Sequence, residues 1–216
     1  MMSIGEEWGI VLFPTQNVTR VTKEVAMRWF KGAVSVVMVG LLVSLAWATL
    51  EITPAMQKEI DRHIEVVKGW AANPVIVKAV LAQNEKGPIA GLDNAKWKTV
   101  RRSDDVIKGF TDSEAGKFLT QKVEGSNGLY VRTFLSAAQG EKVAFNEKTI
   151  DYLHKGREKF DVPFTSGKPW QGKPELDQPT QTYDVQVAVP VVSGGKSVGV
   201  LIVGINLATV EKMVKK

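Results

Sequence analysis

The sequence predicts an α+β domain in which helices come first and an antiparallel sheet follows. Three observations predict it. Apolar residues recur every three or four positions from Met56 to Val67, which is typical of one face of a helix. From Leu129 the apolar period becomes two, as in a half-buried strand. Near the end, two valine-rich runs flank Gly194-Gly195, and glycines tolerate the positive φ of a tight hairpin turn.

The N-terminal half is expected to be helical. Thr53 precedes Pro54, the arrangement of a helix N-cap followed by proline in the first turn, so we expect a first helix over 54–69. Ser113 before Glu114 is a further cap candidate. The other expected elements of this half are a helix over 75–82, a loop over 89–102, a helical turn over 104–109 and a helix over 114–121.

A sheet is expected to follow these helices. Residues 129–136 alternate between two faces, and the alternation places Tyr130 and Arg132 on the same face. A short helix over 207–216 is expected to end the chain. The elements expected between the first strand and the final hairpin are a strand over 142–145, a loop or short helix over 149–155, a strand over 160–165 and a long Gly- and Pro-rich loop over 167–179.

The final hairpin carries the clearest β pattern. Its first strand is expected to have one apolar face, with Tyr183, Val185, Val187 and Val189, and an opposite face with Asp184, Gln186 and Ala188. The second strand, 198–205, is apolar on both faces, which is typical of a central strand covered on two sides. Pro190 lacks a backbone N–H, so it is expected at an edge or a bulge.

Composition excludes several classes of protein. The chain has no cysteine, which excludes disulfides, thiolate metal sites and thiol nucleophiles. The net charge of +5 is modest and the lysines are dispersed, so nucleic-acid binding is not expected. No serine-nucleophile elbow, phosphate-binding loop, zinc-protease motif or dinucleotide-binding motif occurs, so the sequence indicates neither an enzyme nor a cofactor. A disulfide-free exported protein of this size suits a bacterial periplasm.

The N-terminal segment has the layout of an export signal. Residues 27–31 are basic and begin with methionine, 32–50 carry no charge until Glu51, and Ala46-Trp47-Ala48 places small residues where signal peptidase cuts. We therefore expect an upstream extension over 1–26, a signal peptide over 27–48 and a single exported domain over 49–216. The alternative is an uncleaved inner-membrane anchor facing the periplasm, because the uncharged run is long enough to span a bilayer.

The C-terminal half resembles a known family of sensor domains. In the hairpin the residues that carry the resemblance are Tyr183, Val185, Val187, Pro190, Val191, Gly194, Gly195, Lys196, Gly199, Leu201, Val203, Gly204 and Asn206. The stretch 138–156, with Asp151-Tyr152, adds to it. Together they resemble a single Cache domain, a PAS-like extracytoplasmic sensor module, over roughly 54–216. The resemblance implies a long N-terminal helix packed on one face of a five- to six-stranded antiparallel sheet, with a ligand pocket on the other face.

Candidate ligand-binding residues are polar and aromatic side chains that interrupt the sheet pattern or lie in nearby loops. They are Tyr130, Arg132, Asp151, Tyr152, His154, Trp170 and Tyr183. Arg132 offers a bidentate contact to a carboxylate, and the alternative is an exposed strand residue paired with a cross-strand acid. The alternative for the tyrosines and Trp170 is core packing. His63, beside the apolar stripe of the first helix, is expected to lie on the helix surface or to pack between helix and sheet.

The resemblance implies a non-enzymatic periplasmic sensor that binds a small organic ligand, such as a short carboxylate, and signals through a separate membrane receptor or kinase. A soluble ligand carrier would use the same site. Two alternatives stay open. One is a membrane-anchored module that forms a homodimer through its first helix without a ligand. The other, with less support, is a hydrolase.

Overall fold

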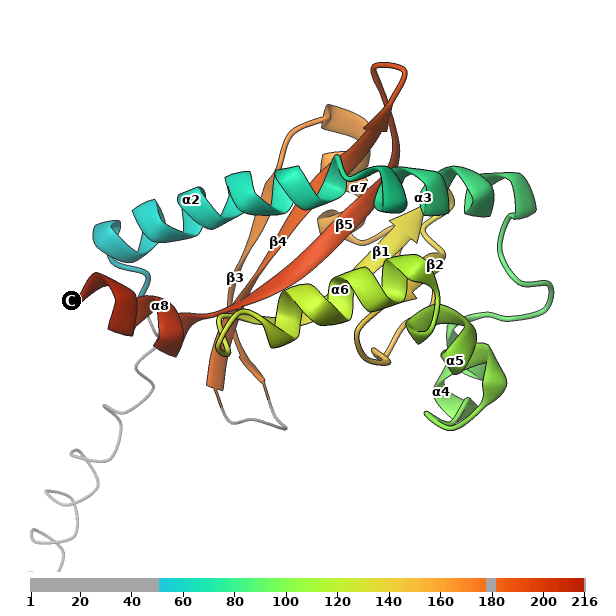
Figure 1. Cartoon of the computed structure of the whole chain (residues 1–216), viewed down its shortest axis with the longest axis horizontal. Coiled ribbons are helices and arrows are strands. Elements are labelled where there is room, and N and C mark those ends of the chain that lie inside the picture. Colours follow the sequence, from blue (N-terminus) through green and yellow to red (C-terminus); the bar gives the residue numbers. More distant parts are fainter. Residues whose placement is uncertain (1–50, 178–181, 216) are drawn as a thin grey trace, which may run out of the picture. The chain divides into compact units, whose positions relative to one another are not determined.

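The computed structural model describes residues 51–177 and 182–215. In this part of the chain five strands form one antiparallel sheet in the order β2-β1-β5-β4-β3 (Figure 1). The strands are β1 (Tyr130–Ala137), β2 (Lys142–Phe145), β3 (Trp170–Asp177), β4 (Thr182–Ser193) and β5 (Lys196–Asn206). Strand β5, whose sequence is apolar on both faces, is the central strand, as expected.

Four helices cover one side of the sheet, which we call the helical face (Figure 1). They are α2 (Pro54–Ala71), α3 (Pro74–Lys86), α6 (Glu114–Glu124) and α8 (Leu207–Val214). Helix α2 begins where the sequence predicts, since the Thr53 side chain accepts a hydrogen bond from the Met56 N–H at 3.3 Å. Apolar side chains of β4 and β5, such as Val187 and Leu201, are fully buried against these helices.

Shorter elements cover the opposite side, which we call the second face. They are α4 (Asn94–Thr99), α5 (Asp105–Thr111), α7 (Glu158–Ser166) and the loop between β2 and α7. Helix α4 holds this loop: the side-chain oxygen Oδ1 of Asn94 accepts from the N–H groups of Tyr152 and Leu153, each at 2.8 Å. The Trp97 indole donates to the Thr149 carbonyl at 2.8 Å. An irregular loop is therefore fixed over the sheet.

The expected α+β fold, with its helices first, is confirmed, but three local expectations are wrong. Residues 160–165 are not a strand, because Phe160 and Phe164 stack at 5.2 Å as neighbours on helix α7. Residues 167–179 are not a continuous loop, because β3 forms there as an edge strand that tolerates Pro174 at a register shift. Within 89–102, Asp93 caps the short helix α4 by accepting from the Lys96 N–H.

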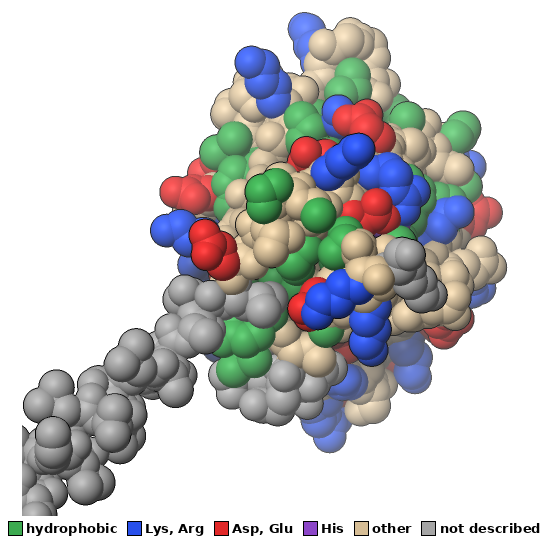
Figure 2. Space-filling model, turned by 90° about the vertical axis from the view of Figure 1, so that its left-hand side faces the viewer, with side chains coloured by type: hydrophobic (Ala, Val, Ile, Leu, Met, Phe, Trp, Pro, Cys, Tyr) green, Lys and Arg blue, Asp and Glu red, His purple; other side chains and the backbone are tan. Residues whose placement is uncertain are grey.

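Pro190 lies where the hairpin pattern expects it. Strand β3 pairs with β4 only as far as Ala188, so the side of Pro190 that faces away from β5 has no partner strand among the described residues. Figure 2 views the end of the domain where α2 begins and α8 ends. Lysine and arginine side chains are interspersed there with aspartate and glutamate, so neither sign of charge dominates this face.

Two expectations concern residues outside the described part. The proposed extension over 1–26 and the signal peptide or anchor over 27–48 both lie there. Among residues 51–177 and 182–215, no helix is both long and apolar enough to cross a membrane.

Candidate functional site

Arg132 and Asp184 form an ion pair on the second face. Arg132 Nη2 donates to Asp184 Oδ2 at 2.9 Å, and the Asp184 side chain is only 1% exposed against 31% for Arg132. The two residues belong to β1 and β4, which both flank β5. Gly204 of β5 lies between Val131 and Gln186. A Cβ at Gly204 would lie 2.8 Å from a Val131 methyl carbon and 3.4 Å from Asp184 Oδ2. A glycine there leaves room for the pair to cross the central strand.

A second group of residues on this face places polar side chains, most of them buried, around one aromatic ring. We call it the Phe134 cluster and define it as Phe134, Ser136, Lys142, His154 and Lys159. The centroid of the Phe134 ring lies 3.5 Å from Lys142 Nζ, 5.8 Å from Lys159 Nζ and 4.6 Å from the centroid of the His154 ring. One aromatic ring thus brings together three nitrogen-bearing side chains from β2, the following loop and α7.

Local backbone structure positions each member of the cluster. Ser136 and Lys142 are partners across β1 and β2, so their side chains share a face. The His154 N–H donates to the Gly140 carbonyl at 2.8 Å. Gly140 has φ 83° and a Cβ there would lie 2.3 Å from the Lys155 nitrogen, so the loop can approach only a glycine. Lys159 Nζ donates to the Gln186 side chain at 3.0 Å, which ties α7 to β4.

Burial dominates the electrostatics of the cluster. The Lys142 and Ser136 side chains are fully buried and His154 is 2% exposed. Burial, and then the charge of Lys159, lower the pKa of Lys142 well below its ordinary value. Burial, and then Lys142, lower the pKa of His154 to about 2. Within residues 51–177 and 182–215, no hydrogen-bond partner lies near Lys142 Nζ, Ser136 Oγ or His154 Nδ1. Buried polar atoms normally have one, so the cluster is suited to receive a ligand.

Most of the residues that the sequence singles out lie on the second face or in the loop over it. Arg132 forms the cross-strand ion pair that the sequence left as an alternative, and His154 belongs to the Phe134 cluster. Trp170 packs against the aromatic core of this face.

Tyr152 lies in the loop over this face. It is fully buried, and its hydroxyl accepts from the Ile89 N–H at 2.9 Å. Asp151 pairs with the Arg157 guanidinium at 3.1 Å. Burial lowers the pKa of both Lys142 and Lys159, and the charge of Asp151 only partly opposes that lowering.

Tyr130 and Tyr183 are not brought together with these residues. The expectation that Tyr130 shares a strand face with Arg132 is wrong, because the register of β1 against β5 shifts between Val131 and Thr133. The extra residue in this irregular stretch turns Tyr130 toward the helices. Tyr183 also packs on the helical face, with the same parity along β4 as Val185.

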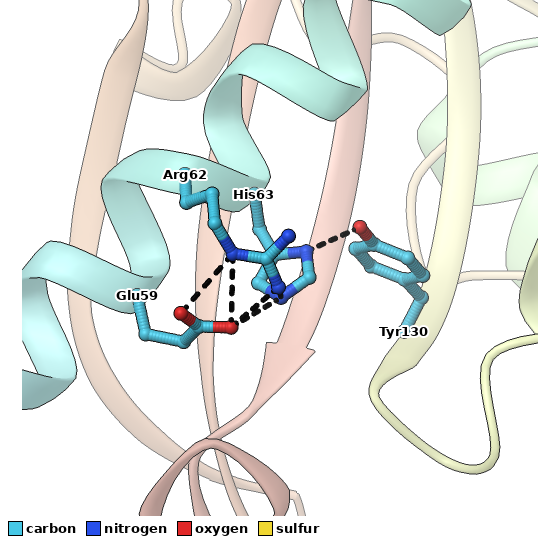
Figure 3. Close-up of polar contacts among 4 residues, drawn as sticks. All are labelled: Glu59, Arg62, His63 and Tyr130. Atoms are coloured by element: carbon cyan, nitrogen blue, oxygen red, sulfur yellow. Dashed lines mark hydrogen bonds and ion pairs between the residues drawn. The ribbon is translucent and has the colours of Figure 1, made fainter. Parts of the chain in front are cut away.

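Tyr130 instead joins a polar chain that connects β1 to α2 (Figure 3). Its hydroxyl lies 2.6 Å from His63 Nδ1, and His63 Nε2 lies 3.1 Å from Glu59 Oε1. Glu59 also accepts from Arg62 Nη2 at 2.6 Å. Burial, and then the Arg62 charge, lower the pKa of His63, and burial raises the pKa of Tyr130 to about 12. His63 therefore packs between helix and sheet, which is one of the two placements that the sequence left open, and its surroundings disfavour the protonated ring.

Sequence reasoning missed Lys142, Lys159 and Ser136 as members of a site. The signal for Lys142 is its position in a short strand whose other residues are apolar, since an inward-facing lysine is rare. The sequence gives no signal for Lys159, because its side chain reaches the site only from helix α7, and the sequence predicts a strand over 160–165 instead. Within the described ranges no three histidine, aspartate or glutamate side chains gather closely enough to hold a metal ion.

The architecture, with helices on one face of an antiparallel sheet and short helices and loops on the other, is the PAS-like fold that the sequence predicts. No family model matches the sequence, and no curated protein matches it significantly. Among solved structures, the chain is similar to the sensor domain of the histidine kinase DctB of V. cholerae, with a TM-score of 0.50 and 18% identity. That match covers 75% of this chain and 54% of the DctB domain, so this chain spans about half of its length.

Two further solved structures are similar at lower scores. The E. coli DcuS sensor domain matches with a TM-score of 0.44 and 14% identity, over 76% of this chain and 100% of that one. The sensory domain of the Campylobacter jejuni chemoreceptor Tlp3, with isoleucine bound, matches with a TM-score of 0.40 and 16% identity, over 74% of this chain and 60% of that one.

Proposed function

We propose that this chain is a non-enzymatic, extracytoplasmic sensor domain that binds a small organic anion, with short carboxylates as the favoured class. The observation that carries the proposal is the buried Phe134 cluster. It holds two lysines against one aromatic ring, and among the described residues neither lysine has an acid within ion-pair distance. A carboxylate would supply the acceptor that Lys142 Nζ lacks and a negative charge beside Lys159.

The physical reason is the free energy of buried charge. Burial disfavours the protonated form of Lys142, and an anion that accepts hydrogen bonds from the amine offsets the cost of burying it without a partner. Lys142 Nζ and Ser136 Oγ are donors to a carboxylate, and the Phe134 ring provides an apolar wall beside them. Phe134, Ser136, Lys142 and His154 are buried and Lys159 is half-buried, which favours a ligand of only a few atoms.

Signalling requires that the ligand bind two conformations with different affinity. Lys159 comes from α7, Lys142 from β2 and His154 from the loop between them, so an anion held by all three draws α7 and the loop toward the sheet. We propose that this movement reaches a separate membrane receptor or kinase. A periplasmic ligand carrier would use the same closure without such a partner.

The test is a thermal-shift series on the full chain with acetate, propionate and succinate, each compared with its uncharged amide. The melting temperature is expected to rise with acid concentration by mass action and to stay constant with the amide. Lys142→Met and Lys159→Met should each abolish the rise, whereas Lys168→Met, at an exposed position, should keep it. No shift with any acid, together with a stable dimer, would instead support the ligand-free pairing module.

A further inference from the structure

We propose that Lys142 captures the carbonyl carbon of a small 2-oxo acid as a reversible imine, so that the ligand is a keto acid held covalently. The inference rests on the proposed function, because it uses the same site. It goes further by naming a functional group of the ligand and the bond that it forms. The observations that carry it are the complete burial of Lys142, the absence of a described partner for its Nζ, and a neighbouring second cation.

The first requirement is an unprotonated amine. At its ordinary pKa near 10.4, only ~0.04% of a lysine is unprotonated at pH 7. Desolvation in an apolar pocket beside another cationic group is the arrangement that makes a lysine nucleophilic toward carbonyl compounds. Lys142 meets both conditions: it is fully buried against Phe134 and Phe145, and the charge of Lys159 acts on it.

The second requirement is a complete reaction without another reagent. The lone pair of Lys142 Nζ attacks the carbonyl carbon, the C=O bond becomes C–O, and one N–H proton moves to that oxygen. Loss of the hydroxyl with the remaining N–H proton releases one water and forms the C=N bond. No oxidant or reductant is needed, and hydrolysis by water reverses the step.

The third requirement is a place for the rest of the ligand. Lys159 Nζ, on the same ring at 5.8 Å from its centroid, is the cation left to hold the carboxylate. Ser136 Oγ and His154 Nδ1 are buried without a described partner, so they can bond the hydroxyl of the tetrahedral intermediate. A keto acid therefore satisfies more of the cluster than a simple acid does.

The experiment traps the imine by reduction. The full chain is incubated at pH 7 with pyruvate and cyanoborohydride, digested, and mapped by mass spectrometry. L-lactate, which has a hydroxyl where pyruvate has the carbonyl, is the matched control. We expect an adduct at Lys142 with pyruvate alone, at least about tenfold above the exposed Lys155 and Lys168, because of the larger unprotonated fraction. The wild-type adduct position does not depend on any variant folding.

Each outcome decides one of the two proposals. Adducts spread over exposed lysines, with Lys142 unmodified, would overturn the imine. If lactate and pyruvate nevertheless both raise the melting temperature, the anion site stands. If no acid raises it, the proposed function fails on its own. Lys142→Arg, which keeps a cation but lacks a primary amine, should lose the adduct while its circular dichroism spectrum shows a folded domain.

Discussion

Arg132 reaches Asp184 across the central strand of the sheet, with 2.9 Å between Nη2 and Oδ2. The acid is almost completely buried, so removing the guanidinium takes a charged hydrogen bond away from a carboxylate that water barely reaches. We expect Arg132→Ala to lower the free energy of unfolding by about 1.5–3 kcal/mol, the range for hydrogen bonds to charged groups. Urea denaturation of Arg132→Ala, Asp184→Asn and the double variant would measure the coupling. Purely additive effects would show that the pair contributes no interaction of its own.

Gly204 should resist even the smallest side chain. Gly204→Ala places a methyl group 2.8 Å from a Val131 carbon, and overpacking of this kind typically costs about 1–3 kcal/mol. The matched control is Gly69→Ala in α2, where a Cβ would meet nothing within 4 Å and helix propensity favours alanine by about 1 kcal/mol. The urea midpoint should therefore fall for Gly204→Ala and rise for Gly69→Ala. A Gly204→Ala protein as stable as the wild type would contradict the packing described here.

Lys142→Met should make the ligand-free domain more stable. Lys142 Nζ is buried without a described hydrogen-bond partner, and leaving a buried polar group unsatisfied typically costs about 1–3 kcal/mol, which an apolar side chain of similar length avoids. The same variant should gain no further stability from carboxylates. Differential scanning calorimetry with and without propionate measures both effects. A large loss of stability would indicate that Lys142 is paired in the folded protein.

Stability should fall as the pH is lowered from 7 toward 4. The pKa values of His63 and His154 are lowered in the fold, that of His154 to about 2, whereas an unfolded histidine titrates near ~6.5. Below that pH the unfolded chain binds protons that the folded chain does not, so protonation favours unfolding. The free energy of unfolding, measured by urea titration at each pH, should fall more steeply with decreasing pH below pH 6.5. His154→Phe should reduce the slope, and an unchanged slope would count against a neutral, buried His154.

Tyr130→Phe tests whether a polar residue on the helical face affects stability without affecting ligand binding. The change keeps the ring but removes the hydroxyl that lies 2.6 Å from His63 Nδ1, so about 0.5–1.5 kcal/mol of stability should be lost. Carboxylate affinity, measured by calorimetry, should stay within twofold, because Tyr130 does not share a face with the Phe134 cluster. Tyr183→Phe is the control on the same face. A selective loss of affinity in Tyr130→Phe would return this residue to the binding site.

The elements that sequence predicts well are those whose pattern is local. The hairpin follows from the Gly194-Gly195 turn and valine alternation, and α2 from its cap and apolar stripe. Helix α7 was missed because Phe160 and Phe164 suit a strand as well as a helix in so short a segment. Strand β3 was missed because Pro174 and nearby glycines indicate a loop, and only pairing with β4 makes it a strand.

The candidate site was harder to predict, because its members meet only in three dimensions. Residue type singles out His154 and Arg132 as candidates, whereas Lys142 and Lys159 resemble ordinary surface lysines in the sequence. Their burial depends on α7 and on the loop that Asn94 fixes. The error over Tyr130 has one cause: a single irregularity in β1, which residue alternation cannot reveal.

That irregularity also lets the first residues of β1 contact both layers that cover the sheet. Tyr130 contacts α2 through His63, and Arg132, two residues later, contacts Asp184 beneath the opposite layer. Only Val131 separates these two residues. We therefore expect a displacement of one layer to be transmitted to the other through the backbone of β1. A substitution at Val131 would then alter the coupling between the two layers, that is, how far α2 moves when the Arg132–Asp184 side of the sheet is displaced.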